Sequence, residues 1–200
     1  MTDASVLYHG SLTRFDPESF RPMSHFGSIR AALQRAGELL SRRLHDDSDA
    51  CAFIYPVRLA IRSPFPIADG QNMKHGPCAM ADALFYGRRK LLSAAERDRV
   101  LSSASNDLEA AFAILASIIR SRGHDGLIYK NRHEDRGQDS FIALDGASVT
   151  PDGDPCPISM PEIISWLREL ESPQTMPEAA VSLDRRFGRV QPHAGGMEFR

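Results

Sequence analysis

The sequence has no apolar run long enough to cross a membrane, because its longest apolar stretches fall far short of the roughly 20 residues that a spanning helix needs. The first residues, MTDASVLYHG, also lack the positive segment and following apolar run of a Sec-type signal peptide. We therefore predict no membrane partner. The simplest expectation is a protein that stays in the cytoplasm of the cell that makes it.

Cysteine and excess positive charge are also scarce. The three cysteines, Cys51, Cys78 and Cys156, form no CxxC pair, which argues against a disulfide framework and against a zinc site, and we predict no bound metal. The net charge is −2 with neutral histidines, so no basic excess points to a nucleic-acid partner. What the chain does have is 42% hydrophobic and 25% charged residues, which is typical of a globular domain with a real core.

Apolar residues at helical spacing predict three main helices, each with a capping signal at its start. They are expected over residues 29–44 with Ser28 as N-cap, over 107–121 with Asn106 and Glu109 as a capping box, and from Ser159 with Glu162 to Leu170. One or two further helices are expected before residue 107. We predict one domain over residues 1–171 and a polar, partly disordered tail over residues 172–200.

Strands are expected over residues 5–8, 51–61, 127–130 and 140–145. The strand over 51–61 alternates, and the proline within it, Pro56, predicts an edge position or a bulge. Residues 11–27 contain three phenylalanines but no clear period, so we expect an irregular segment there. The order strand, helix, strand, helices, strand, strand does not alternate as in a doubly wound fold. It predicts an α+β fold with a small, mostly antiparallel sheet.

Common nucleotide-binding and hydrolase motifs are absent, but three segments carry residues suited to a ligand. In Tyr8–Ser11 (YHGS) an imidazole precedes a turn glycine, whose bare backbone lets a flat ligand approach. In His25–Ser28 (HFGS) aromatic groups precede a helix N-terminus, which suits a planar ring and an anionic group. In 123–145 a polar loop, NRHEDRGQD, holds carboxylates between two strands. Each segment taken alone is more typical of a structural feature, namely a strand-end turn, a hydrophobic anchor with an N-cap, or a solvated charged hairpin.

Taken in order, these segments resemble the ADP-ribosyltransferase superfamily, especially its small bacterial, plasmid and phage members found in polyvalent proteins. The shared pattern runs from YHGS through HFGS at a helix start and a strand like YPVRLAIRSPFPI to GHDGLIYKN and DSFIALD, over about residues 5–150. The resemblance implies an ADP-ribosyltransferase-like split β-sandwich of small antiparallel sheets with flanking helices, and NAD+ as the substrate in its cleft. The helices between residues 77 and 122 are then an insertion that covers the cleft or recognises the acceptor.

The resemblance assigns NAD+-binding roles to residues of each motif. It implies that His9 contacts the adenine-side ribose and that the backbone of Gly10 holds the nicotinamide carboxamide. The aromatic motif falls on His25 and Phe26, and because many relatives have tyrosine where His25 stands, an imidazole would stack on the nicotinamide here. The other residues expected to bind the cofactor are Ser11, Ser28, Asn131 and Ser140, with Asn131 also orienting the loop after it.

The family usually supplies a glutamate that hydrogen-bonds the nicotinamide ribose and stabilises the positive charge that builds as the glycosidic bond breaks. In the poly-ADP-ribose enzymes it directly precedes the aromatic residue of the last motif, where this chain has Ser140. Two carboxylates could take the catalytic role, Glu134 in the preceding loop or Asp139. Strand alternation puts Asp139 and Ser140 on opposite faces, so only one of these two can face the cleft.

The function implied is that of a mono-ADP-ribosyltransferase that cleaves NAD+ at the nicotinamide glycosidic bond and transfers ADP-ribose to a protein acceptor. Such a protein could be a bacterial effector or toxin, delivered without a Sec signal to act on a protein of a host cell. Two alternatives remain open: an NAD+ glycohydrolase with water as acceptor, and a catalytically inactive domain that only binds a nucleotide or a partner protein. All three need His9 and an acidic side chain near residue 135 to line the same hollow.

Overall fold

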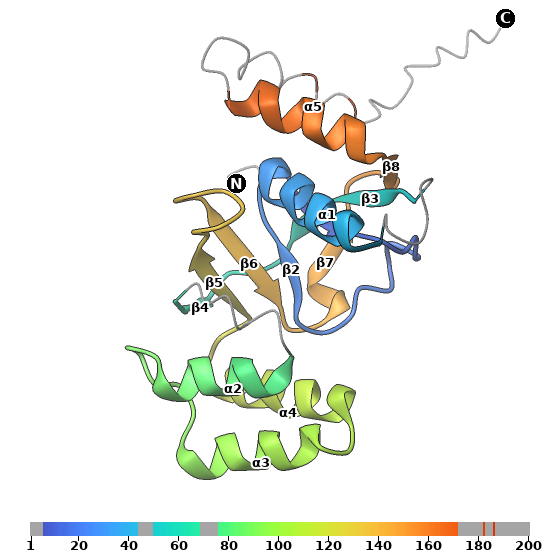
Figure 1. Ribbon diagram of the computed structural model, residues 1–200. Coiled ribbons are helices and arrows are strands. Elements are labelled where there is room, and N and C mark those ends of the chain that lie inside the picture. The colour runs from blue at the N-terminus through green and yellow to red at the C-terminus, as the bar shows by residue number, and fades with distance from the viewer. Residues whose placement is uncertain (1–5, 44–49, 69–75, 172–181, 183–185, 187–200) are drawn as a thin grey trace, which may run out of the picture.

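The computed structural model describes residues 6–43, 50–68, 76–171, 182 and 186, and within them the chain forms five α-helices and eight short strands (Figure 1). The elements are β1 (Leu7–Ser11), β2 (Ser24–Phe26), α1 (Ile29–Arg43), β3 (Ala52–Leu59), β4 (Pro64–Pro66), α2 (Pro77–Tyr86), α3 (Ala94–Ala104), α4 (Leu108–Ser121), β5 (Gly126–Lys130), β6 (Asp139–Ala143), β7 (Val149–Pro151), β8 (Cys156–Ile158) and α5 (Met160–Glu171). The α+β class expected from the sequence is confirmed. The expected tail over 172–200 lies outside the described residues, apart from Ser182 and Arg186.

The first sheet is built around β3, which is paired along both edges. One edge pairs antiparallel with β1, and the other pairs antiparallel with β8 and then with β7. The edge position predicted from Pro56 is therefore wrong. Pro56 lies between the part of β3 paired with β8 and the part paired with β7, and its partner in β1, Tyr8, directs its backbone N–H and C=O to Gly27 instead. A central strand tolerates this proline because the missing N–H falls at the junction of two short strands.

The second sheet has the order β2-β6-β5-β4, in which the pair β4–β5 is parallel and the other pairs are antiparallel. The sequence did not predict β2, because residues 11–27 show no alternation. A bridge joins this sheet to the first: Tyr8 N–H donates to Gly27 O at 2.8 Å, and Gly27 N–H donates to Tyr8 O at 3.1 Å. A Cβ on Gly27 would lie 2.8 Å from Ser140 Oγ and 3.2 Å from Ala31 Cβ, so glycine is needed where β1, β6 and α1 converge.

Helix α1 lies on the first sheet, and α5 lies on α1 (Figure 1). Ser28 caps α1 as expected, since its Oγ accepts a hydrogen bond from Ala31 N–H at 3.1 Å. The turn expected at Gly10 is wrong, because β1 continues through Gly10 to Ser11. Gly10 is required for another reason: a Cβ there would lie 2.5 Å from the carbonyl oxygen of Ala32. The absent side chain lets α1 approach β1 closely enough to bury its apolar face.

Helices α2, α3 and α4 form a separate layer below the second sheet (Figure 1). Their buried side chains form one core with residues of β4, β5 and β6, including Leu84, Leu115, Ile119, Leu127 and Ile142.

The capping residue of α4 is Asp107 and not Asn106, because Asp107 Oδ1 accepts hydrogen bonds from Glu109 N–H at 2.9 Å and from Ala110 N–H at 3.0 Å. Among the described residues, no helix combines the length and apolar character needed to span a bilayer.

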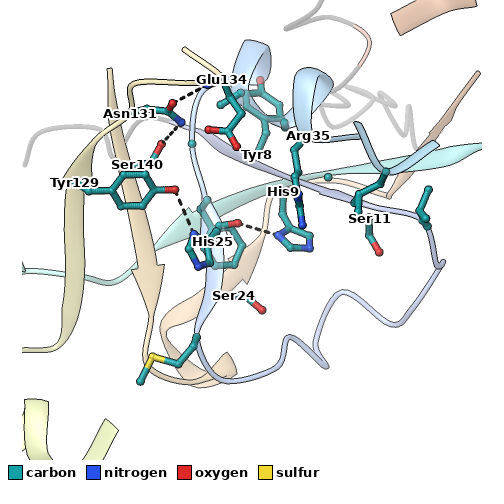
Figure 2. A pocket seen from close by; sticks show the side chains of 18 of the residues that line it. Tyr8, His9, Ser11, Ser24, His25, Arg35, Tyr129, Asn131, Glu134 and Ser140 are labelled. Carbon is teal, nitrogen blue, oxygen red and sulfur yellow. Dashed lines mark hydrogen bonds between the residues drawn. The ribbon is translucent and has the colours of Figure 1, made fainter. Parts of the chain in front are cut away.

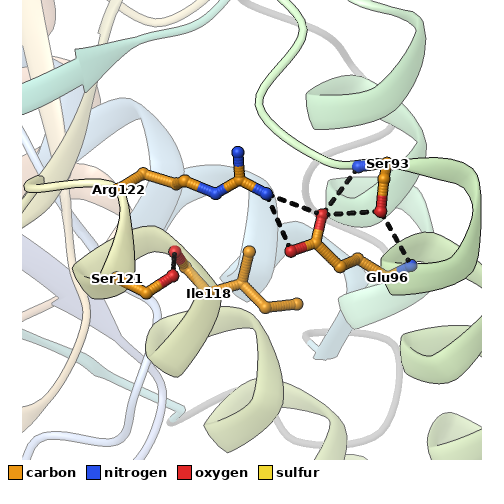
Figure 3. Close-up of polar contacts among 5 residues, drawn as sticks. All are labelled: Ser93, Glu96, Ile118, Ser121 and Arg122. Atoms are coloured by element: carbon orange, nitrogen blue, oxygen red, sulfur yellow. Dashed lines mark hydrogen bonds and ion pairs between the residues drawn. The ribbon is translucent and has the colours of Figure 1, made fainter.

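A polar contact ties the start of α3 to the end of α4 (Figure 3). Ser93 and Glu96 form a reciprocal capping box, in which Glu96 Oε2 accepts hydrogen bonds from the backbone N–H and the hydroxyl of Ser93, each at 2.8 Å. Arg122, just after α4, donates to both carboxylate oxygens at 2.9 and 3.1 Å. Together these hydrogen bonds lower the pKa of Glu96 to about 2, so the contact is intact at neutral pH.

We predict that Gly10→Ala destabilises the protein by about 1–3 kcal/mol, because the new Cβ would press on backbone atoms that cannot move independently. Urea unfolding should show a lower midpoint with an unchanged slope. Gly37→Ala is the matched control, since its Cβ in α1 would meet only the Ile163 side chain, at 3.3 Å, and alanine favours the helix. An unchanged midpoint for Gly10→Ala would contradict the close packing of α1 on β1.

Candidate functional site

A cavity of about 470 Å³ lies between β1, β2, α1, β5 and the loop 131–138, with residues of α2 and α4 on its wall (Figure 2). Pockets that hold small organic ligands typically have about 300–1,000 Å³. Eight of the ten site residues predicted from the sequence line it: His9, Gly10, Ser11, His25, Phe26, Asn131, Glu134 and Ser140. The fold thus brings His9, near the start of the chain, to the same hollow as Glu134.

The imidazole of His9 lies in the middle of β1, not at a strand end, and is held in one orientation. Its Nδ1 donates a hydrogen bond to the carbonyl oxygen of His25, 2.8 Å away. Because a carbonyl can only accept, Nδ1 carries the proton, and Nε2 of the neutral ring keeps a lone pair for a ligand hydroxyl. Aromatic rings surround the imidazole at centroid distances of 5.4 to 6.2 Å, namely Phe15, Phe20, Phe26 and Tyr55.

The surroundings of His9 favour its neutral form. Burial is the largest effect and lowers the pKa of His9 from 6.5. The hydrogen bond to the His25 carbonyl acts in the opposite direction, and the positive charge of Arg35 lowers the pKa further. An uncharged ring at neutral pH keeps Nε2 as an acceptor.

Gly10 and Ser11 continue the cavity wall after His9. The close approach that Gly10 permits is made by α1, so its bare backbone already serves the packing of the fold. Ser11 Oγ donates to Thr13 O at 3.0 Å and accepts from Thr13 N–H at 3.1 Å, which shapes the turn after β1.

His25 and Tyr129 form an aromatic pair on the wall between β2 and β5. His25 Nδ1 and the Tyr129 hydroxyl share a hydrogen bond of 3.2 Å, and the two rings meet edge to face with centroids 5.9 Å apart. Phe26 also lines the cavity, but it is 1% exposed and packs in the core with Phe20 and Val57. His25 therefore offers a ligand a polar ring, whereas Phe26 mainly anchors β2.

Asn131 organises the loop that carries Glu134. Its side-chain Oδ1 accepts hydrogen bonds from three successive backbone N–H groups, those of His133 at 3.0 Å, Glu134 at 2.8 Å and Asp135 at 3.2 Å. Its Nδ2 donates to Ser140 Oγ at 3.2 Å. Asn131 is 2% exposed, so these groups have no access to water as an alternative partner. The expected orienting role of Asn131 is confirmed, and its polar atoms are used by the protein itself.

The same loop is fastened to the first turns of α1. Ser28 Oγ donates to Asp135 Oδ2 at 2.5 Å, and Gln34 Nε2 donates to the carbonyl oxygen of His133 at 3.4 Å. Glu134 lies between these two attachment points and is 7% exposed. Its side chain reaches into the cavity from above in Figure 2. A buried carboxylate held by a rigid loop acts more strongly on a nearby charge than one in water does.

Ser28 and Asp139 are the two predicted site residues that do not line the cavity. Asp139 begins β6 and forms an ion pair with Lys130 at 2.9 Å, in which the two side chains are 43% and 67% exposed. Ser140, the next residue, does line the cavity, as strand alternation requires. Of the two carboxylates considered from the sequence, Glu134 is the one that lines the same cavity as His9.

Arg35, Tyr129 and Tyr8 also line the cavity and were not expected from the sequence. Arg35 follows Ala31 at helical spacing, but helix periodicity alone does not tell which face of α1 meets a ligand. Tyr129 was placed only as a strand residue. Within the described part of the chain, no group of three His, Cys, Asp or Glu side chains is arranged to hold a metal ion.

We predict that His9 titrates below 6.5 and carries its proton on Nδ1 at pH 7, which long-range ¹⁵N–¹H NMR measures directly. Because the pKa is lower in the folded state, the unfolded chain takes up this proton first as the pH falls through about 6.5. The folded state should therefore lose stability below that pH, and His9→Gln should remove this part of the pH dependence. A midpoint above 6.5, or a proton on Nε2, would contradict the assigned hydrogen bond.

We also predict that Asn131→Ala lowers the free energy of unfolding by about 1–3 kcal/mol, because buried N–H groups lose their acceptor. Amide hydrogen exchange at Glu134 and its two neighbours should become faster. Asn131→Asp keeps the acceptor oxygen and is expected to preserve the protection of these amides. Equal exchange rates in the wild type and Asn131→Ala would show that another group holds the loop.

No protein-family model and no curated protein matches the chain. A solved structure described as the crystal structure of an anti-CRISPR protein is similar, with 14% sequence identity, a TM-score of 0.29, and coverage of 75% of this chain and 96% of that one. A TM-score this low carries no argument about shared fold or function.

Proposed function

We propose that the protein binds NAD+ in this cavity, cleaves the nicotinamide glycosidic bond, and transfers ADP-ribose to a protein acceptor. The observation that carries the proposal is the meeting of His9 and Glu134 at one cavity of about 470 Å³. Both residues come from segments that resemble ADP-ribosyltransferase motifs. The two residues are more than a hundred positions apart in the sequence. An ADP-ribosyltransferase-like fold would explain why both line one cavity.

The arrangement of the sheets supports an ADP-ribosyltransferase-like split β-sandwich as the fold. Two sheets of four strands each are joined by the backbone bridge between Tyr8 and Gly27, in the two motifs expected to bind NAD+. The cavity lies beside that bridge, because the bridged residues Tyr8 and Gly27 line it themselves, together with His9 next to Tyr8 and Phe26 next to Gly27. A site at the split between two sheets is what the resemblance implies for the substrate cleft.

Each wall of the cavity matches one part of NAD+. A neutral His9 accepts a hydrogen bond at Nε2 from a ribose hydroxyl. The rings of His25 and Tyr129 offer contacts to the planar nicotinamide. His25 stands where many relatives have tyrosine, and its hydrogen bond to the Tyr129 hydroxyl adds a phenol group beside it on the cavity wall.

Glu134 has the chemistry needed at the reacting bond. As the bond between ribose C1′ and the nicotinamide nitrogen breaks, its electron pair goes to the nicotinamide ring, which becomes neutral, and positive charge develops at C1′. A carboxylate in a site that excludes water stabilises this charge more in the transition state than in bound NAD+. The acceptor then forms the new bond to C1′ and loses its proton. Water in place of a protein acceptor would give NAD+ hydrolysis by the same first step.

We predict that the purified protein releases nicotinamide from NAD+ and labels a protein in a cell lysate with ADP-ribose, and that Glu134→Gln lowers both rates by about 100-fold or more. Glutamine keeps the shape of the side chain and removes its charge. Nicotinamide release is measured by chromatography, and the adduct by mass spectrometry.

Two further variants make the test specific. Glu109→Gln removes an exposed carboxylate of α4 outside the cavity and is the matched control for activity and folding. Asp139→Asn tests the other carboxylate considered from the sequence, and we expect it to retain activity. Nicotinamide release without a labelled protein would favour the glycohydrolase, and NAD+ binding without turnover would favour an inactive binding domain. A folded protein that neither binds nor cleaves NAD+ would refute the proposal.

A further inference from the structure

Arg35 is a charged residue of the cavity that the proposed function has not used. Among the described residues that line the cavity, it is the one Arg or Lys, and Glu134 is the one Asp or Glu. A guanidinium on the wall of a ligand-sized cavity can bind an anionic group of a ligand, because its planar fork of N–H donors matches the geometry of carboxylate and phosphate oxygens. The cavity therefore has one positive and one negative position for a ligand.

The position of Arg35 on α1 directs its side chain to the cavity. Ala31, Arg35 and Leu39 follow one another at intervals of four residues, and all three line the cavity. Gly10 and Ala32, which have little or no side chain, line the same cavity. Figure 2 shows Arg35 extending from α1 toward His9, which agrees with the effect of its charge on the pKa of His9.

The existing ion pair of Arg35 is weak. Arg35 Nη1 lies 3.5 Å from Glu38 Oε2 one turn along the same helix, and the two side chains are 33% and 36% exposed. Pairs of this kind between exposed side chains contribute little to stability. A phosphate group, with several charged oxygens, accepts two parallel hydrogen bonds from a guanidinium and is the stronger partner.

We propose that Arg35 binds a phosphate group of the nucleotide in this cavity, beside the ribose hydroxyl that hydrogen-bonds His9. The ribose contact rests on the proposed function, whereas phosphate binding can be tested without it. Two phosphates of a pyridine dinucleotide can lie next to that ribose: the bridging diphosphate, which NAD+ and NADP+ share, and the 2′-phosphate, which NADP+ alone carries. Both have the same chemistry toward a guanidinium.

The test measures binding by calorimetry with three probes: ADP, inorganic pyrophosphate and adenosine. Arg35→Gln should weaken the binding of pyrophosphate by about 10- to 100-fold, because pyrophosphate loses charged hydrogen bonds, and leave adenosine unchanged. ADP, which has a 5′-diphosphate and no 2′-phosphate, should be weakened as well where Arg35 binds the bridging diphosphate. Arg42→Gln, in the same helix and exposed outside the cavity, is the matched control and should bind all three as the wild type does. Circular dichroism verifies that both variants are folded.

A second arm identifies the phosphate. If Arg35 binds the bridging diphosphate, Arg35→Gln should weaken NAD+ and NADP+ equally. If it binds the 2′-phosphate, the variant should weaken NADP+ alone. Either pattern supports phosphate binding by Arg35, and unchanged affinity for both dinucleotides overturns it.

Failure of this inference is distinguishable from failure of the proposed function. Glu134-dependent cleavage of NAD+ together with normal binding of pyrophosphate, NAD+ and NADP+ by Arg35→Gln would overturn the inference and leave the function standing. Arg35-dependent binding of ADP and pyrophosphate without any NAD+ cleavage would refute the proposed function and support phosphate binding by Arg35. A wild-type protein that binds neither ADP nor pyrophosphate would overturn the phosphate site.

Discussion

The pair of backbone hydrogen bonds between Tyr8 and Gly27 is the contact on which the candidate site depends. It fixes β2 against β1, and so brings the His25 carbonyl within 2.8 Å of His9 Nδ1. It also joins the two sheets at the point where the cavity opens. A Cβ at position 27 would lie 2.8 Å from Ser140 Oγ and 3.2 Å from Ala31 Cβ, so any other residue would have to displace these side chains. The contact between these two segments of the chain thus decides the tautomer of the imidazole and the place of the cavity.

Several residues expected to touch a ligand instead hold the residues that do. Asn131 uses its amide on the loop backbone and on Ser140, and Ser28 binds Asp135 while it caps α1. Glu134 therefore lies on a loop that is held by hydrogen bonds within the loop and by hydrogen bonds to the start of α1. A catalytic carboxylate gains from such fixation, because no reorganisation is then needed when charge develops next to it.

The sequence predicted the helices well and the short strands poorly, for a physical reason. The helices over 29–43 and 108–121 repeat their apolar pattern over several turns, whereas β2, β4, β7 and β8 span three residues each, too few for alternation to appear. The edge position predicted from Pro56 was wrong for a related reason. Its strand, β3, is central, and a proline is acceptable there only because β3 pairs on that side with two short strands, β7 and β8, and Pro56 lies between them. Asp107 replaced Asn106 as cap because either residue type suits that position.

Local sequence determined which residues were candidates for ligand binding or catalysis. These were a histidine before a glycine, a paired aromatic motif, and acidic residues in a polar loop. It also fixed that Asp139 and Ser140 face opposite ways, since alternation is a property of the strand itself. Tertiary structure alone decided that Glu134, and not Asp139, lines the cavity that His9 lines, and that Arg35 of α1 lines it too. Those outcomes depend on the packing of segments far apart in the chain, and no pattern of neighbouring residues encodes such packing.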